Sequence, residues 1–235
     1  MAGWVKKKAG VRRAELLDSA QALFFAKGYE ATTIADIMEQ AGVSKGGFYH
    51  HFSAKEDLLE ALGERMAAEA VVRLEPILEQ AGLDAVGRMN AALSHGRRFK
   101  IEDAAAIRAA FDTAFKPENI VLYHRLNRAV SKVMLPFFTT ILKQGKAEGR
   151  FRIDDPETTA EIIMQLGVST RDAVGRAIEA SGTPHAEEAA TALDERLRQQ
   201  GIAIDRILGL PDGTIVFSEP GFARAVMSPT AAGGR

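Results

Sequence analysis

The sequence predicts an all-α protein that has a small N-terminal domain of three helices and a larger helical body. Apolar residues recur at intervals of three and four along most of the chain, which is the period of a helix with one buried face. Glycine and proline separate the periodic segments. The 235 residues are 46% hydrophobic and 26% charged, as in an ordinary globular protein. We expect domains at 10–70 and 71–208, followed by a partly irregular tail at 209–235.

Composition excludes several classes of site. The chain has no cysteine, which rules out disulfides, thiolate zinc sites and cysteine nucleophiles. Its first residues are basic, but no apolar segment follows them, so we expect that they do not form a signal peptide. The most apolar run, at 133–142, is too short to span a bilayer. We therefore expect a cytoplasmic protein without a membrane partner.

The net charge of −1 is unevenly distributed. Residues 1–55 hold eight Lys and Arg residues against five Asp and Glu residues, so this part carries +3 and the remainder −4. A positive N-terminal domain suits a polyanionic partner such as DNA, although charge alone does not decide the matter. A basic arm precedes the first helix and is either a solvated terminus or a phosphate or minor-groove contact. It consists of Lys6, Lys7, Lys8, Arg12 and Arg13.

Local signals define the helices of the first domain. They are expected at about 11–27, 33–41 and 45–51. Thr33 is a good N-cap, and Asp36 three residues later completes a capping box. Gly42 can adopt the left-handed conformation that ends a helix, and Ser44 can cap the next one. Two short helices joined by a tight turn over 33–52 form a helix-turn-helix, whose second helix enters the DNA major groove.

The segment AGVSKGGFYHHFSAKEDLL, with TTI a short way upstream, resembles the DNA-binding domain of the TetR family of bacterial transcriptional regulators. The resemblance covers about residues 10–70. It implies a fourth helix that links this domain to a variable, ligand-binding body. Gly47 departs from the family pattern, because many relatives have a side chain there. Two glycines near a helix start weaken it by roughly 1 kcal/mol each relative to alanine, and we expect poor base readout at Gly46 and Gly47.

Polar side chains around the predicted turn are the candidate DNA contacts. Hydroxyl and backbone N–H groups at helix N-termini favour anions, and lysine, tyrosine and histidine can donate to phosphates. Lys45, His50 and Tyr49 are also candidates for base-edge contacts, whereas the resemblance places Tyr49 and His51 at the phosphate backbone. Adjacent histidines on a helix point about 100° apart, so no metal site is expected. The full set is Thr32, Thr33, Ser44, Lys45, Gly46, Gly47, Tyr49, His50, His51 and Lys55.

The fourth helix is expected to begin at Ser53, with Glu56 completing a capping box, and to run to Leu74 before it meets Pro76. Further helices are expected at about 84–99, 102–114, 118–148, 156–180 and 185–208. Pro136 should kink the third of these. In the tail, TIVF at 214–217 could form one short strand, and the residues from 228 onward are expected to be disordered.

The last two long helices are rich in small residues and carry apolar stripes. One stripe consists of Ile163, Leu166, Val174 and Ile178, and the other of Leu193, Leu197, Ile204 and Leu208. Such faces either close the core of one chain or pair with a second copy. The pattern alone favours a core, whereas the resemblance implies a homodimer through 156–180 and 185–208. A dimer would read a palindromic operator with two half-sites.

Aromatic and methionine side chains are concentrated in the body, together with a few polar groups. Taken singly, each is best explained as core, but the set could line an apolar ligand pocket with sparse polar groups. The candidates are Met89, His95, Phe99, Phe111, Phe115, Tyr123, Asn127, Met134, Phe137, Met164 and Arg171.

We expect a DNA-binding transcriptional regulator, and specifically a repressor that releases its operator when a small hydrophobic effector binds the body. A coupling of about 1–3 kcal/mol would suffice. A ligand-independent DNA-binding protein, or an activator, is the alternative. No catalytic residue or cofactor is expected, because the sequence has no phosphate-binding glycine loop, serine nucleophile elbow or HExxH zinc motif. Asp154 and Asp155 are better explained as a helix cap than as an acid–base pair.

Overall fold

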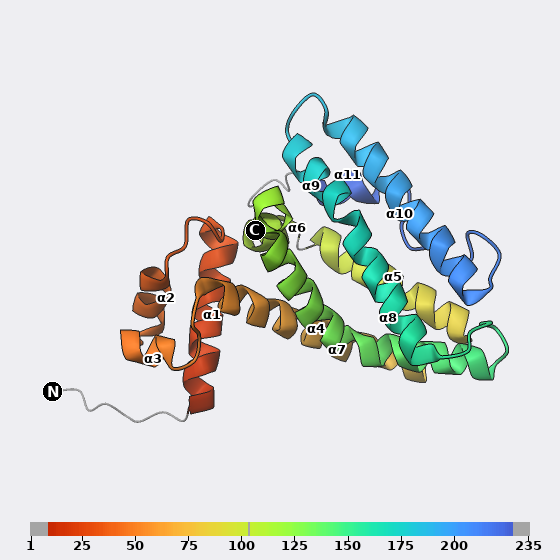
Figure 1. The fold of residues 1–235 in the computed structure, drawn as a ribbon, viewed down its shortest axis with the longest axis horizontal. Helices are drawn as coiled ribbons and strands as arrows, with labels where there is room; N and C mark the ends of the chain where they lie inside the picture. The colour runs from red at the N-terminus through yellow and green to blue at the C-terminus, as the bar shows by residue number, and fades with distance from the viewer. Residues whose placement is uncertain (1–8, 103, 228–235) are drawn as a thin grey trace.

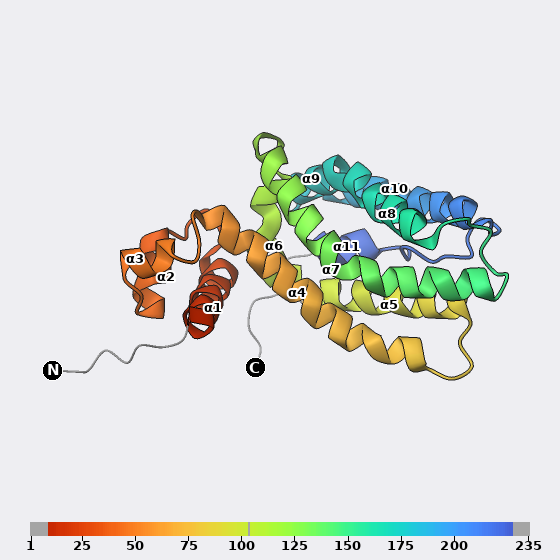
Figure 2. The same cartoon turned by 60° about the horizontal axis from the view of Figure 1, so that its bottom comes forward.

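The computed structural model describes residues 9–102 and 104–227, and these residues form an all-α protein, as predicted. A small head lies at one end of the molecule and a larger helical body at the other (Figure 1). The head comprises α1 (Ala9–Lys27), α2 (Ile34–Ala41) and α3 (Lys45–Tyr49). The long helix α4 (Lys55–Glu79) starts in the head and continues along the body (Figure 2).

The body contains seven further helices within the described residues. They are α5 (Ala85–Glu102), α6 (Ala104–Phe115), α7 (Ile120–Ala147), α8 (Pro156–Leu166), α9 (Arg171–Ala180), α10 (Ala186–Leu208) and α11 (Phe222–Met227). Two 3₁₀ turns, η1 (Pro117–Asn119) and η2 (Gly167–Thr170), connect neighbouring helices. None of the helices in this described part is long and apolar enough to cross a bilayer.

A core of aromatic and aliphatic side chains fixes the short helix α3 against the rest of the head. Phe48 of α3 is fully buried, and Phe52 just after the helix is nearly so. They join Phe24 of α1 and Ile37 of α2 in one apolar cluster, which also includes leucines at the start of α4. Five residues of helix would be unstable alone, so tertiary packing holds α3 in place.

The capping signals of the helix-turn-helix are confirmed. Thr33 Oγ1 accepts a hydrogen bond from the Asp36 backbone N–H at 3.1 Å, and the Asp36 carboxylate accepts one from the Thr33 N–H at 2.8 Å. Gly42 ends α2 with a left-handed φ of 59°. Ser44 Oγ accepts from the Gly47 N–H at 3.2 Å and so caps α3. Short-range chemistry therefore sets the turn geometry.

The predicted start and end of the fourth helix are wrong. Asp57, not Glu56, accepts from the backbone N–H groups of Ser53 and Ala54, at 2.8 and 3.2 Å, and the helix begins at Lys55. At its far end α4 continues through Pro76 to Glu79. Proline removes the hydrogen bond to the carbonyl four residues earlier, that of Val72. Val72 is 64% exposed, so the interruption lies on the solvent side of α4 and the helix need not stop there.

The predicted helix at 156–180 is also wrong, because η2 divides it into α8 and α9. Hydroxyl groups next to the glycine of η2 compete for the backbone carbonyls: Ser169 Oγ donates to the Leu166 carbonyl and Thr170 Oγ1 to the Gly167 carbonyl, both at 2.7 Å. Pro136 lies within α7, as expected.

The C-terminal tail contains a short helix in place of the possible strand. Residues 214–217 form no strand, and the short helix α11 follows them. The Asp205 carboxylate accepts from the backbone N–H groups of Gly213, Thr214 and Ile215, which takes up donors that a strand would need for pairing. The tail then returns to the body, where α11 contacts α5, α9 and α10. The predicted disorder from 228 onward and the lysines of the basic arm lie outside the described residues.

Candidate nucleic-acid interface and ligand cavity

The outer face of the helix-turn-helix is polar and accessible. Lys45, Tyr49 and His50 are exposed, and the Tyr49 side chain shows 49% of its surface. Thr33 and Ser44, which cap α2 and α3, are exposed on the same motif. Because Phe48 anchors the opposite side of α3, these five residues form a rigid polar surface, which we call the head surface.

The two histidines follow the end of α3 rather than continuing it, contrary to the predicted helix at 45–51. Their rings pack edge to face with centroids 4.8 Å apart. Partial burial, with the neighbouring His50 and Arg13, lowers the pKa of His51 below its usual value. His51 is therefore neutral at pH 7 and can donate one N–H hydrogen bond. No metal-ligand cluster of three or more His, Asp or Glu residues occurs in the described part of the chain.

Lys55 and Thr32 are turned into the protein, which corrects their expected role as DNA contacts. Lys55 Nζ donates to the backbone carbonyls of Tyr29 and Thr32, both at 2.9 Å, and lies 4.1 Å from the centroid of the Tyr29 ring. Thr32 is fully buried, and its hydroxyl donates to the Gly28 carbonyl at 2.8 Å. Both side chains hold the loop between α1 and α2, whose carbonyls would otherwise lack partners.

The two glycines of α3 have different surroundings. A Cβ atom on Gly47 would lie 2.8 Å from Val43 Cγ1, closer than van der Waals contact allows, whereas Gly46 has open space around it. The departure from the family pattern at Gly47 therefore has a packing reason: the turn residue Val43 occupies the place of a side chain.

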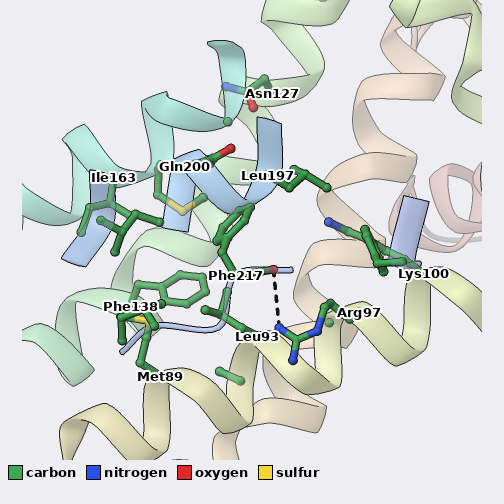
Figure 3. Close-up of a pocket in the computed structure, with 17 residues that line it drawn as sticks. Met89, Leu93, Arg97, Lys100, Asn127, Phe138, Ile163, Leu197, Gln200 and Phe217 are labelled. Carbon is green, nitrogen blue, oxygen red and sulfur yellow. Dashed lines mark hydrogen bonds between the residues drawn. The ribbon is translucent and has the colours of Figure 1, made fainter. Parts of the chain in front are cut away.

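Two adjoining lobes of a cavity lie between the helices of the body. The first, of about 290 Å³, lies beside α5 and α8, and includes Met89, Asn127 and Met164 of the predicted set (Figure 3). The second, of about 330 Å³, lies between α6 and α9. Of the predicted residues it is lined by Phe111, Phe115, Tyr123 and Asn127.

The other predicted pocket residues lie elsewhere. His95 is exposed, and Phe99 lies beneath the guanidinium of Arg73, 5.0 Å from ring centroid to Cζ. Phe137 and Met134 pack in the core of the body. Arg171 is buried beside the second lobe, where it donates to the Lys116 carbonyl at 2.5 Å.

The sequence reasoning missed four residues that line both lobes. Lys100 and Gln200 are polar, and Phe217 and Phe222 come from the tail. Arg97 holds the tail in position, because its guanidinium donates to the Val216 carbonyl at 2.5 Å and to Glu219 at 2.6 Å. The glutamine and lysine occur in ordinary polar positions of helical patterns, so no sequence signal separated them from surface residues.

One acidic group lines the second lobe. Burial raises the pKa of Asp112 to about 6, while the nearby positive charges of Arg108 and Lys116 oppose this rise. The carboxylate is therefore mostly charged at pH 7 but protonates in mildly acidic solution.

Comparisons with known proteins agree with this architecture. The family model for bacterial regulatory proteins of the tetR family matches residues 16–62, and that for the Tetracyclin repressor-like C-terminal domain matches residues 104–173. The HTH-type transcriptional repressor KstR2 of Mycobacterium tuberculosis (strain ATCC 25618 / H37Rv) is 47% identical over 51 residues, which are 22% of this chain and 26% of that protein. The match to this relative thus spans about a quarter of its length.

A longer match extends into the body. The uncharacterized HTH-type transcriptional regulator YfiR of Bacillus subtilis (strain 168) is 28% identical over 158 residues, 66% of this chain and 75% of that protein. The solved structure of RolR in complex with resorcinol shares the fold, with a TM-score of 0.59 and 22% identity over 94% of this chain and 95% of that one. With both domains matched in chain order and the helix-turn-helix in place, the chain belongs to the TetR family of bacterial regulatory proteins.

Proposed function

We propose that the protein is a dimeric transcriptional repressor, which binds operator DNA through the head surface and releases it when a small apolar effector enters the cavity. The observation that carries this proposal is the position of α6, which lies between the second lobe and the head. One face of α6 presents Ile107, Phe111 and Phe115 to the lobe. A ligand that displaces these side chains must displace the helix or strain its packing.

The other face of α6 is bonded to the head. The Ala109 carbonyl accepts from the Tyr29 N–H at 3.0 Å. Thr113 is buried, and its hydroxyl donates to the Glu30 carboxylate at 2.6 Å. The same carboxylate also pairs with Lys116 at 3.2 Å. A shift of α6 is therefore transmitted to the loop between α1 and α2, which leads into the helix-turn-helix.

A second connection runs from α7 to α4. Arg125 of α7 donates to Asp57 at 2.7 Å and to Glu60 at 2.9 Å, and these ion pairs are partly buried. Tyr123 and Asn127, two residues to either side of Arg125, line the cavity. Because α4 begins directly after the helix-turn-helix, movement of α7 reorients the DNA-binding helix.

For DNA, we propose that Lys45, Tyr49 and His50 face the major groove, and that Thr33, Ser44 and His51 bind phosphates. Gly46 and Gly47 allow the backbone of α3 to approach the DNA closely. Thr32 and Lys55 contribute only by holding the loop. Two copies would bind a palindromic operator, since one short helix reads few base pairs.

For the dimer, we propose the outer faces of α8 and α10. The stripe on the last helix does not serve this purpose, because it is buried within one chain. It consists of Leu193, Leu197, Ile204 and Leu208. Ile162 of α8 is half exposed and points away from that core. Replacing Ile162 by glutamate should convert the dimer to monomer in sedimentation-velocity experiments, and an unchanged dimer would move the interface elsewhere.

The DNA-binding part is tested with an operator selected from random duplexes and measured by fluorescence anisotropy. Lys45→Ala and Tyr49→Ala should each weaken binding about tenfold, and Lys45→Ala should reduce the salt dependence by the equivalent of one phosphate contact or alter the preferred base. Lys132→Ala, at an exposed lysine of α7, is the matched control and should change the affinity less than twofold. Wild-type affinity in both head variants contradicts the proposed surface.

A further inference from the structure

Three polar residues of the cavity lie where its two lobes meet. Lys100, Asn127 and Gln200 each line both lobes. Most of the remaining lining is apolar, with leucine, isoleucine, methionine and phenylalanine side chains from α5, α8, α10 and the tail (Figure 3). We call the position of these three polar residues the waist. A ligand's polar atoms belong at the waist and its apolar parts in the lobes.

Lys100 supplies an uncompensated positive charge at the waist. Within the described part of the chain it makes no hydrogen bond or ion pair, and Figure 3 shows its amine directed across the cavity toward Leu197. The residue as a whole is exposed, and desolvation of the amine on the cavity side lowers its pKa below the usual value. The adjacent cation differs, because Arg97 is paired with Glu219 and a backbone carbonyl. Arg108 in the second lobe donates to Ser181 Oγ and the Met227 carbonyl and faces Asp112, so Lys100 is the cation available to a ligand at the waist.

Among the described residues, the carboxylate that lines the second lobe does not neutralise Lys100. Asp112 interacts electrostatically with Arg108 and Lys116 instead. Arg108 and Lys116 offset the Asp112 charge, so this part of the lobe offers an anion little attraction, whereas Lys100 attracts one to the waist. The charged side chains therefore favour a negatively charged ligand group and place that group at the waist.

Gln200 adds a hydrogen-bond acceptor. Its side chain is more than nine-tenths buried, and no protein group donates to its Oε1 atom. Figure 3 shows the amide of Gln200 on the cavity side of α10, opposite Asn127. A buried acceptor without a donor is destabilising, so a ligand that places a hydroxyl donor at this point should bind severalfold more tightly.

We propose that the effector is an apolar hydroxy acid, whose carboxylate binds Lys100 and whose hydroxyl donates to Gln200 Oε1. This inference rests on the proposed function, since it specifies the ligand of the same cavity. Each lobe has room for a fused ring system or a comparable alicyclic body, given cavities of about 290 and 330 Å³.

Three matched probes test this assignment by isothermal titration calorimetry. They are 6-hydroxy-2-naphthoate, its carboxamide and 2-naphthoate, which differ only in the charge or the hydroxyl. Wild type should bind the hydroxy acid at least about tenfold more tightly than the carboxamide, as expected for a charge-assisted hydrogen bond. In Lys100→Met this preference should disappear, whereas Lys132→Met should retain it.

The hydroxyl is tested at Gln200. Wild type should prefer 6-hydroxy-2-naphthoate to 2-naphthoate by about fivefold or more, and Gln200→Leu should bind the two equally. This variant removes a buried acceptor that lacks a donor, so its melting temperature should not fall, and its folding can be verified by circular dichroism.

Three results would each overturn the assignment. Wild type could bind the acid and the carboxamide equally, Lys100→Met could keep the preference for the acid, or no probe could bind. Operator binding measured with the same probe separates this outcome from the proposed function. If the probe binds with the predicted preferences but leaves operator affinity unchanged, the effector-release mechanism fails and the ligand class stands. If the preferences are absent but another molecule releases the operator, the ligand class fails alone.

Discussion

Replacing Asp205 by alanine should loosen the tail that covers the cavity and lower the stability of the body. The carboxylate is fully buried and accepts three backbone hydrogen bonds, from Gly213 at 2.6 Å, Thr214 at 3.2 Å and Ile215 at 2.8 Å. These bonds fix the start of the segment that places Phe217 in the cavity wall. The tail therefore depends on one charged side chain.

The cost can be worked out from the three donors. Gly213 is exposed and Thr214 partly exposed, so water replaces most of the hydrogen bonding to these two amides. The Ile215 amide is buried, and leaving it unpaired costs about 1–3 kcal/mol in addition to the lost charge-assisted bonds. We expect a total of about 3 kcal/mol, which lowers the melting temperature by about 6–12 °C in a chain of this size.

Differential scanning calorimetry measures this loss. Asp212→Ala is the matched control, because Asp212 lies in the same turn but is exposed and pairs only with Arg206 at the surface. Exposed ion pairs contribute about 0–1 kcal/mol, so the control should melt within a few degrees of wild type. Equal melting temperatures for the two variants would refute the role of Asp205 in ordering the tail.

Four other substitutions probe the head, its connection to the body and the cavity. Thr113→Val keeps the shape of the side chain but removes the hydrogen bond to Glu30. The weakening of operator binding by the effector, measured by anisotropy, should shrink severalfold in this variant. Undiminished release of the operator would contradict transmission through α6. Asp112→Asn removes a carboxyl group whose pKa is raised to about 6 in the folded protein. In wild type this group stabilises the fold below its unfolded pKa, which is near 4. The stabilisation is lost as the pH rises through 6. The variant should consequently gain about 2 kcal/mol relative to wild type at pH 7.5 but not at pH 4 in urea titrations, and a gain independent of pH would contradict the burial of the charge. Gly46→Ala should raise the melting temperature, because the site is open and alanine favours a helix by about 1 kcal/mol. Gly47→Ala should lower the melting temperature, because its Cβ would lie 2.8 Å from a valine side chain. A change of the same sign in both variants would contradict the packing of α3.

Features set by neighbouring residues could be predicted from the sequence. The capping box of Thr33 and Asp36, and the left-handed end of α2 at Gly42, follow from residues three to nine positions apart, and the structure shows both. The start of α4 shows the limit of this reasoning. Two acidic residues, Glu56 and Asp57, could serve as the capping acceptor, and the structure uses Asp57, which also pairs with Arg125 of a distant helix.

Contacts between distant segments could not be predicted in the same way. Lys55 was expected at the DNA because lysine donates to phosphates, but its partners are carbonyls 23 and 26 residues earlier in the chain. Adjacent helical residues differ by about 100° in direction, which is why Phe138 rather than Phe137 lines the cavity. Lys100 and Gln200 meet at the waist only because α5 and α10 enclose the same space.

Effector binding in the cavity and operator binding at the head are coupled in the proposed mechanism, and this coupling is reciprocal by thermodynamic linkage. The most direct measurement is the calorimetric affinity of 6-hydroxy-2-naphthoate for the free protein and for the operator complex. We predict that the operator-bound protein binds the probe more weakly, by the same factor, of at least about fivefold, by which the probe weakens operator binding. Equal affinities for the free and operator-bound forms would contradict the account.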